Sequence, residues 1–371
     1  MKISFTSLML ICWIQIFSTA VCTSNSIKAD TGSQRLKNVL AKTVSEEKLP
    51  GMIAAIANKN GLLLIESAGR RNVNSFMQIT KNDLFHIGSC TKAMTGTLMA
   101  ILISDNKLSW ESTIIEIFPE VKNSIHKKYH NITLHQLLTH RGEIPANAKD
   151  WGIYTNQELK ERRLSIMKDN LKEANQLMAG ENLYSNLGYM IAGCMAERVT
   201  GLTWEELMKK YLFEPLGMKS AGFGAPGSNM MFDQPWGHNK LHGEWVPRQI
   251  DNPEALGPAG TVHCTLKDWA KFVALQLPKN KNSLLNQNQL DFLIEPIGSY
   301  ACGWGVHERN WANGIALTHS GSNTLWYATV WVAPKLNRIF LVGTNFANEN
   351  SGIVCDKIIG ELIQINQEFY H

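Results

Sequence analysis

Ser89 and Lys92 are the first pair of residues whose types and spacing could do chemistry together. They follow Gly88 in the stretch FHIGSCTKAMTG and open an apolar segment that is predicted to be helical. Three residues make nearly one helical turn, so Lys92 is expected on the same face as Ser89. A serine in a first helical turn faces unpaired backbone N–H groups, which favour a developing negative charge. A lysine kept from water beside it would have a lowered pKa and could accept the serine proton.

The Ser-x-x-Lys spacing does not by itself identify a catalytic pair, because it occurs five times in the chain. In the alternative, structural interpretation, Ser89 is only a helix cap and Lys92 is a surface residue. The other four pairs lie at polar helix ends, in a basic loop or on a charged helix: Ser45/Lys48, Ser104/Lys107, Ser124/Lys127 and Ser165/Lys168. None of them has the apolar setting of the pair at 89 and 92, so the context favours that pair.

Two further groups of residues have a spacing suited to substrate binding. Tyr184 and Asn186 lie in a predicted loop that enters an apolar helix, from which a phenol could point into a cleft. His319 and Gly321 end a predicted strand, and Ser322 follows. A strand edge with glycine lets a substrate lie close to the backbone and offers the Ser322 N–H to an oxyanion. Both spacings also recur by chance: Tyr129/Asn131, Tyr154/Asn156, His86/Gly88 and His140/Gly142.

The elements that must position these residues come from both ends of the chain. Helices are predicted at 35–48 and at 352–369, the second with Ser351 as its N-cap. Strands are predicted at 52–57, 62–67, 315–318, 326–333 and 338–345. The first two flank Asn58-Lys59-Asn60-Gly61, a strong hairpin signal. The pattern predicts an α+β fold, with an antiparallel sheet built from both chain ends and flanked by helices.

The middle of the chain is predicted to be a mostly helical insertion. Its expected helices cover 133–138, 156–172, 186–200, 203–212 and 266–277. We therefore predict a catalytic domain over 33–371, with an α/β part at 33–115 and 288–371 and the helical insertion at 116–287. The cleft between the sheet and the insertion is the expected small-molecule site.

The N-terminus predicts export. Lys2 precedes an apolar run at 8–17, and Ser18-Thr19-Ala20 is a small-x-small cleavage pattern, so residues 1–20 are interpreted as a signal peptide. Residues 21–32 are then a flexible leader, and the protein is expected to be periplasmic or secreted. A retained anchor and a lipoprotein attached through Cys22 stay open as alternatives, although the run is short for a bilayer span.

The composition and charge of the chain exclude some classes of function. The net charge of +4 is spread along 371 residues, which excludes a nucleic-acid stripe. Five cysteines outside the leader are far apart, so buried free thiols are expected, with one disulfide left open: Cys90, Cys194, Cys264, Cys302 and Cys355. No Cys or His cluster has metal-ligand spacing, so neither a metal nor a cofactor is predicted. A monomer is expected.

Together these motifs resemble the serine β-lactamase-like superfamily, in the branch of class C β-lactamases, penicillin-binding D-Ala-D-Ala peptidases, esterases and D-amino-acid peptidases. The resemblance covers about 33–367 and is carried by Ser-x-x-Lys at 89–92, Tyr-x-Asn at 184–186 and His-x-Gly at 319–321, in the family's order. The flanking stretches agree: ITLHQLLTHRGEIP (132–145), the run from Gly180 through VTGLTWEELMKKYLFEPLGM to Met218, and GPAGTVHCTLKDWAKF (257–272).

The resemblance implies acyl transfer through a serine ester. Ser89 would attack a carbonyl, and Lys92 and Tyr184 would share the proton transfers as a coupled pair, with Lys92⁺ stabilising the phenolate. The N–H groups of Ser89 and Ser322 would form the oxyanion hole. Asn186 would hold a substrate amide or orient Lys92.

His319 departs from the family pattern, because penicillin-recognising members usually have lysine there. A histidine with a pKa near 6.5 is mostly neutral at pH 7, so the site would keep a hydrogen-bond donor and lose most of the charge. This difference favours ester or peptide hydrolysis over β-lactam hydrolysis. The alternative function is a penicillin-binding or cell-wall sensor protein that is acylated at Ser89 without efficient turnover.

Overall fold

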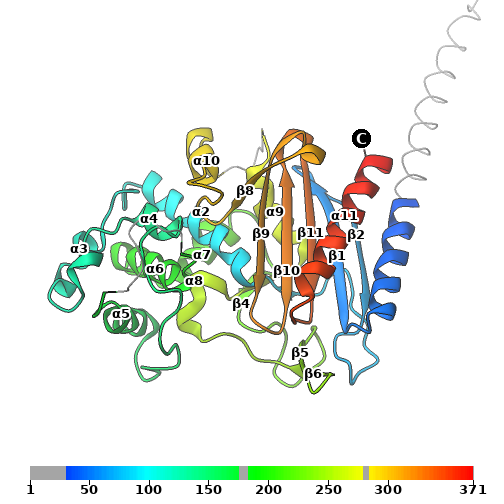
Figure 1. The fold of residues 1–371 in the computed structure, drawn as a ribbon, viewed down its shortest axis with the longest axis horizontal. Coiled ribbons are helices and arrows are strands. Elements are labelled where there is room, and N and C mark those ends of the chain that lie inside the picture. Colours follow the sequence, from blue (N-terminus) through cyan, green and yellow to red (C-terminus); the bar gives the residue numbers. More distant parts are fainter. Residues whose placement is uncertain (1–30, 175–182, 279–283, 371) are drawn as a thin grey trace, which may run out of the picture.

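A six-stranded antiparallel sheet forms the centre of the protein (Figure 1). The computed structural model describes residues 31–174, 183–278 and 284–370. The strand order is β2-β1-β11-β10-β9-β8. The bounds are β1 Gly51–Asn58, β2 Gly61–Gly69, β8 Gly305–Arg309, β9 Gly314–Ser322, β10 Tyr327–Ala333 and β11 Arg338–Thr344. The pairing of β1 with β11 joins the two ends of the chain, which confirms the predicted α+β fold.

The sheet is covered on both faces, which explains why β1 is apolar along most of its length. One face packs against the helix at 31–46 and against α11 (Ser351–Phe369), which lie side by side in Figure 1. The other face packs on the helical part of the chain. Alternate residues of β1 belong to these two cores: Met52, Ala54 and Ile56 to the first, and Ile53, Ala55 and Ala57 to the second.

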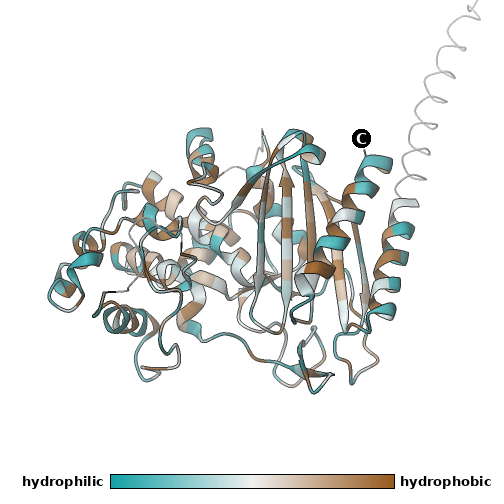
Figure 2. Cartoon of the chain, viewed as in Figure 1, coloured by the Kyte–Doolittle hydropathy of each residue, from teal (hydrophilic) through white to brown (hydrophobic). Residues whose placement is uncertain are grey.

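Most of the remaining elements are helices on one side of the sheet (Figure 1). They are α2 Thr91–Ser104, α3 Ile114–Ile117, α4 Leu134–Leu138, α5 Leu159–Asn170, α6 Asn186–Thr200, α7 Trp204–Met208, α8 Gly257–Gly260, α9 Leu266–Val273 and α10 Gln287–Ile294. Brown segments run along the sheet strands in Figure 2, whereas α5 and α10 carry teal residues. The helices predicted in the middle of the chain are present, most of them shorter than expected.

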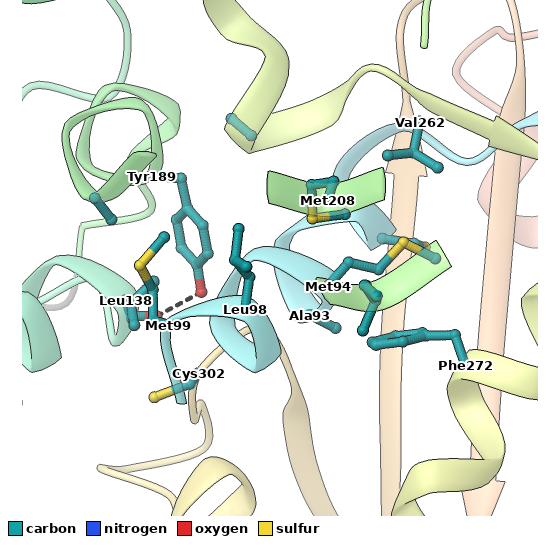
Figure 3. Packing of buried hydrophobic residues seen from close by; sticks show 14 of the residues in the cluster. Ala93, Met94, Leu98, Met99, Leu138, Tyr189, Met208, Val262, Phe272 and Cys302 are labelled. Carbon is teal, nitrogen blue, oxygen red and sulfur yellow. Dashed lines mark hydrogen bonds between the residues drawn. The ribbon is translucent and has the colours of Figure 1, made fainter. Parts of the chain in front are cut away.

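The helix α2 is the centre of the second core. Every residue from Thr91 to Leu102 is buried, so the helix is surrounded by protein. Figure 3 shows Ala93, Met94 and Leu98 among side chains of neighbouring elements. Because α2 is held on all sides, the residues at its N-terminal end have little freedom to move.

Several details differ from the sequence-based predictions. β8 was not predicted, nor were β3 (Phe85–His86), β4 (Gly222–Phe223), β7 (Val262–Cys264) or the hairpin of β5 (Gly237–Leu241) and β6 (Glu244–Arg248). Ser351 is the first residue of α11 rather than its cap. The cap position is Asn350, without a side-chain hydrogen bond, and the Ser351 hydroxyl donates to Asn348 instead.

Within the described residues, no helix has both the length and the apolar character needed to cross a membrane. The five cysteines of these residues are free and buried, as predicted. The signal peptide, nearly all of the leader, and Cys22 fall in residues 1–30, which lie outside the described residues, so those interpretations stay predictions.

Candidate active site

Ser89 lies in a short 3₁₀ turn, η1 (Gly88–Cys90), directly before α2. The sequence-based prediction placed it in the first turn of the helix, and the structure moves it one turn earlier. Gly88 has a φ of +50°, a left-handed conformation that glycine adopts without a steric cost. The turn therefore needs glycine immediately before the serine.

The Ser89 turn and the end of β9 approach each other so closely that glycine is needed on both sides. A Cβ atom on Gly88 would lie 2.3 Å from the backbone nitrogen of Ser322. A Cβ atom on Gly321 would lie 2.4 Å from the backbone nitrogen of Ser89. The backbone N–H groups of Ser89 and Ser322 thus border the same small space, as an oxyanion hole requires.

Lys92 is fully buried, and its amine has three polar neighbours. Its Nζ lies 3.0 Å from Ser89 Oγ, 2.7 Å from Asn186 Oδ1 and 2.8 Å from the carbonyl oxygen of Ala259. Burial lowers the pKa of Lys92 well below its usual value of 10.5. A neutral amine has two N–H donors and one lone pair. Because the two carbonyl oxygens can only accept, the neutral form of the amine directs its lone pair at the Ser89 hydroxyl.

Tyr184 lies at the mouth of this group, just before α6, with 41% of its surface exposed. Lys92 Nζ lies 4.7 Å from the centre of its ring, over the face. Burial raises the pKa of the phenol, and a hydrogen bond with Ser89 only partly offsets that effect. The phenol of Tyr184 therefore keeps its proton at neutral pH, whereas the sequence analysis expected a phenolate stabilised by Lys92. Of Tyr184 and Lys92, Lys92 is the better base.

The structure places His319 beside Tyr300, with both ring nitrogens occupied. Nδ1 lies 2.7 Å from the carbonyl oxygen of Ser320, and Nε2 lies 3.0 Å from the Tyr300 hydroxyl. Since the carbonyl can only accept, Nδ1 carries the hydrogen and Nε2 accepts from Tyr300. Burial and the nearby Lys92 lower the pKa of His319 to about 3. The expected free donor at this position is therefore missing, although the expected loss of charge is present.

Comparison with known proteins shows the family to which the chain belongs. A family model described as Beta-lactamase matches residues 36–361. The chain belongs to the Beta-lactamase family. This membership confirms the resemblance to the serine β-lactamase-like superfamily.

Individual proteins that resemble this Beta-lactamase family chain have low sequence identity to it. It is similar to Protein flp of Staphylococcus aureus (strain MW2), with 24% identity over 333 residues, 85% of this chain and 64% of the relative. It is similar to a Beta-lactamase of Providencia stuartii, with 25% identity over 249 residues, 67% of this chain and 61% of the relative. The chain thus spans less than two thirds of the length of these curated relatives.

The fold of this Beta-lactamase family chain is also found in solved structures. One of them is an octameric penicillin-binding protein homologue from Pyrococcus abyssi. The two share 20% sequence identity with a TM-score of 0.75, over 91% of this chain and 79% of that chain. At this identity, the likeness supports the fold only.

All seven predicted site residues lie together at one junction between the large sheet and the helices. They are Ser89, Lys92, Tyr184, Asn186, His319, Gly321 and Ser322. Asn186 accepts from Lys92 and donates to Asn147 Oδ1 at 2.8 Å, which orients its amide. The junction is where the cleft between sheet and insertion was predicted. Among the described residues, no group of three or more His, Cys, Asp or Glu side chains could hold a metal ion.

Sequence reasoning missed His140, which supports Tyr184. The two rings lie 4.4 Å apart, and His140 Nδ1 accepts from the backbone N–H of Ser185 at 3.0 Å. Burial lowers the pKa of His140 to about 2, so the ring is neutral. The only sequence signal was the chance His-x-Gly match at His140, which does not predict a contact with a residue 44 positions away.

Proposed function

We propose that this chain is an exported serine hydrolase that forms an acyl-enzyme on Ser89 and acts on esters, D-amino-acid peptides or amides, or β-lactams. The observation that carries the proposal is the buried Lys92 amine, 3.0 Å from the Ser89 hydroxyl. Among the described residues, Lys92 forms no salt bridge with a carboxylate that would hold it charged. Export rests on the signal-peptide pattern of residues 1–20.

In the acylation step, Lys92 takes the proton of Ser89 as the serine oxygen attacks the substrate carbonyl carbon. A new carbon–oxygen bond forms, and the carbonyl oxygen becomes an oxyanion between the N–H groups of Ser89 and Ser322. When the intermediate collapses, the bond to the leaving group breaks and the leaving group takes the proton from the Lys92 ammonium. Tyr184, which is hydrogen-bonded to Ser89, is placed to pass that proton on.

In the deacylation step, water attacks the Ser89 ester. The same base accepts a proton from the water, the bond between the acyl carbon and the serine oxygen breaks, and Ser89 recovers its proton. Asn186 keeps the Lys92 amine aimed at this space through the 2.7 Å hydrogen bond. The acid product leaves and the site returns to its starting state.

A second candidate function is a penicillin-binding or cell-wall sensor protein that is acylated at Ser89 and turns over slowly. The raised pKa of Tyr184 favours this candidate if deacylation uses Tyr184 in place of Lys92, because a phenol that keeps its proton is a poor base for activating water. The two functions share the acylation step and differ only in deacylation.

Intact-mass spectrometry tests the proposal and separates the two candidates. The chain is incubated with a short-chain 4-nitrophenyl ester and, separately, with a penicillin, while product release is followed. Fast release of nitrophenol with a transient adduct on Ser89 supports the hydrolase. A long-lived adduct without turnover supports the sensor. Full ester hydrolysis by a folded Ser89→Ala variant would rule out both.

A further inference from the structure

The end of β9 is a free strand edge beside the candidate oxyanion hole. β8 pairs with β9 only as far as Thr318, opposite Gly305. Beyond that point, the residues from His319 to Ser322 have no strand partner on that side within the described part of the chain. His319 and Gly321 are both buried and alternate with exposed residues, so they face the Ser89 turn. A substrate group lying along this edge would meet His319 next to the reacting carbonyl.

At this edge, the hydrogen-bonding capacity of His319 is already used inside the protein. Its Nδ1–H is donated to Ser320 O, and its Nε2 lone pair is taken by the Tyr300 hydroxyl. The Tyr300 ring is fixed in turn by His140, whose ring centre is 4.7 Å away. An ionised carboxylate placed here would find neither a cation nor a free donor on His319, and removing a charge from water without such a partner is costly.

The titratable groups around His319 come from each element packed against it, and they are positive or neutral: Lys92 of α2, Cys90 of η1, His140 after α4, Tyr184 before α6 and Tyr300 before β8. Lys92 is the only lysine or arginine among them, and its three hydrogen-bonding positions are directed at Ser89, Asn186 and Ala259. None of these groups is a free cation aimed at the edge of β9.

We propose that Tyr300 is a specificity-determining residue that locks His319 as an internally satisfied, uncharged side chain, so that the site selects acyl donors without a carboxylate beside the scissile bond. The substrate class is therefore neutral esters and amides. This inference rests on the proposed serine hydrolase function and narrows it. Tyr300 has no place in the acyl-transfer steps, so it sets the choice of substrate without taking part in the chemistry.

The test uses two esters that differ only in one carboxylate on the leaving group: 4-nitrophenyl butyrate and 3-carboxy-4-nitrophenyl butyrate. For each protein, kcat/KM for the neutral ester is divided by kcat/KM for the anionic ester. This ratio is then divided by the ratio of the two rate constants for hydroxide-catalysed hydrolysis, which removes the difference in intrinsic reactivity between the esters. The result is the preference for the neutral ester. A charge-assisted hydrogen bond changes binding by about 10- to 100-fold. We therefore expect the wild-type protein to prefer the neutral ester by about 10-fold or more, with no change between pH 8 and pH 5.5.

Two variants should change this preference by different routes. Tyr300→Phe removes the hydroxyl from Nε2, so the ring can carry its hydrogen on Nε2 and donate it to a carboxylate, and the preference for the neutral ester should fall several-fold at pH 7. His319→Lys supplies a cation directly and should lower the preference about 10-fold or more at pH 7. The matched control is Tyr129→Phe, which removes a hydroxyl from a different tyrosine, one that is buried and donates to Glu173 O, and it should leave the ratio unchanged.

The outcomes separate this inference from the proposed function. Turnover of both esters through a Ser89 adduct, with a wild-type ratio near one or a ratio that folded Tyr300→Phe leaves unmoved, overturns the role of Tyr300 and leaves the proposed hydrolase function in place. The complete absence of a Ser89 adduct with either ester overturns the proposed function and this inference with it. If Tyr300→Phe fails to fold, the ¹⁵N chemical shifts of His319 in the wild-type protein decide the question: a hydrogen on Nδ1 alone at pH 5.5 supports the role of Tyr300, and a hydrogen on Nε2 overturns it.

Discussion

The imidazole Nε2 of His86 lies 3.0 Å from the carboxylate of Asp251, and this pair connects the two sides of the candidate oxyanion hole. On one side, His86 Nδ1 accepts the backbone N–H of Gly88, at the Ser89 turn, at 3.1 Å. On the other side, Asp251 accepts from the Asn323 side chain, directly after Ser322, at 2.8 Å. A continuous chain of hydrogen bonds therefore holds the turn and the strand end together.

Asp251→Asn should lower kcat and leave KM for a neutral ester nearly unchanged. Burial raises the pKa of Asp251, but the interactions with His86, the Asn323 side chain and the Asn252 backbone together lower it below its usual value, so the carboxylate is ionised and its hydrogen bond with His86 is charge-assisted. Weakening that bond loosens the alignment of the two backbone N–H groups, for which we expect a loss of about 10-fold in kcat. Steady-state kinetics with 4-nitrophenyl butyrate measures the changes in kcat and in KM separately. A loss confined to KM would show that Asp251 acts on substrate binding instead.

Gly321→Ala should abolish most of the activity. The new methyl group would lie 2.2 Å from Ile87 O and 2.4 Å from Ser89 N, so the strand edge and the turn must separate. Losing one oxyanion-hole donor costs about 100- to 1,000-fold in kcat. Gly360→Ala in α11 is the matched control, because nothing lies within 4 Å of its Cβ position, and this variant should keep full activity. Ester hydrolysis at a normal rate by Gly321→Ala would contradict the assigned oxyanion hole.

Lys92 should make both activity and stability depend on pH. Because its folded-state pKa lies well below 10.5, the unfolded chain binds more protons in the range between the two values. The free energy of unfolding should therefore rise with pH across that range. Lys92→Met should be inactive and should show a smaller rise. Denaturant unfolding between pH 7 and pH 9 measures this, with the exposed Lys219→Met as the control. An unchanged slope in Lys92→Met would show that the lysine is charged in the folded protein.

His319 should lower the free energy of unfolding at acidic pH. Its folded-state pKa of about 3 lies below the unfolded value of 6.5, so the unfolded state binds the extra proton as the pH falls from 6.5 towards 3. Stability is lost at up to about 1.4 kcal/mol per pH unit in that range. Between pH 7 and pH 5, His319→Gln should lose about 2 kcal/mol less than the wild-type protein. Urea unfolding at both pH values measures the difference, and the exposed His242→Gln serves as the control.

Much of the fold could be predicted from the sequence because its signals are local. The hairpin of β1 and β2 follows from two apolar runs around Asn60-Gly61, and α6 follows from apolar periodicity. The strands that were missed are short or polar. β5 and β6 contain His238, Lys240 and Glu244, so they lack the apolar alternation of a half-buried strand. They form because they pair with each other across a tight turn.

The sequence by itself determined which residues are candidates for the chemistry, through the apolar setting of Ser89 and Lys92 and through the family resemblance that includes Gly321. The tertiary structure alone decided their protonation and their hydrogen bonds. The lowered pKa of Lys92 depends on its burial, and the missing donor of His319 depends on Tyr300. Such effects come from desolvation and from partners far apart in the chain, which no local pattern encodes.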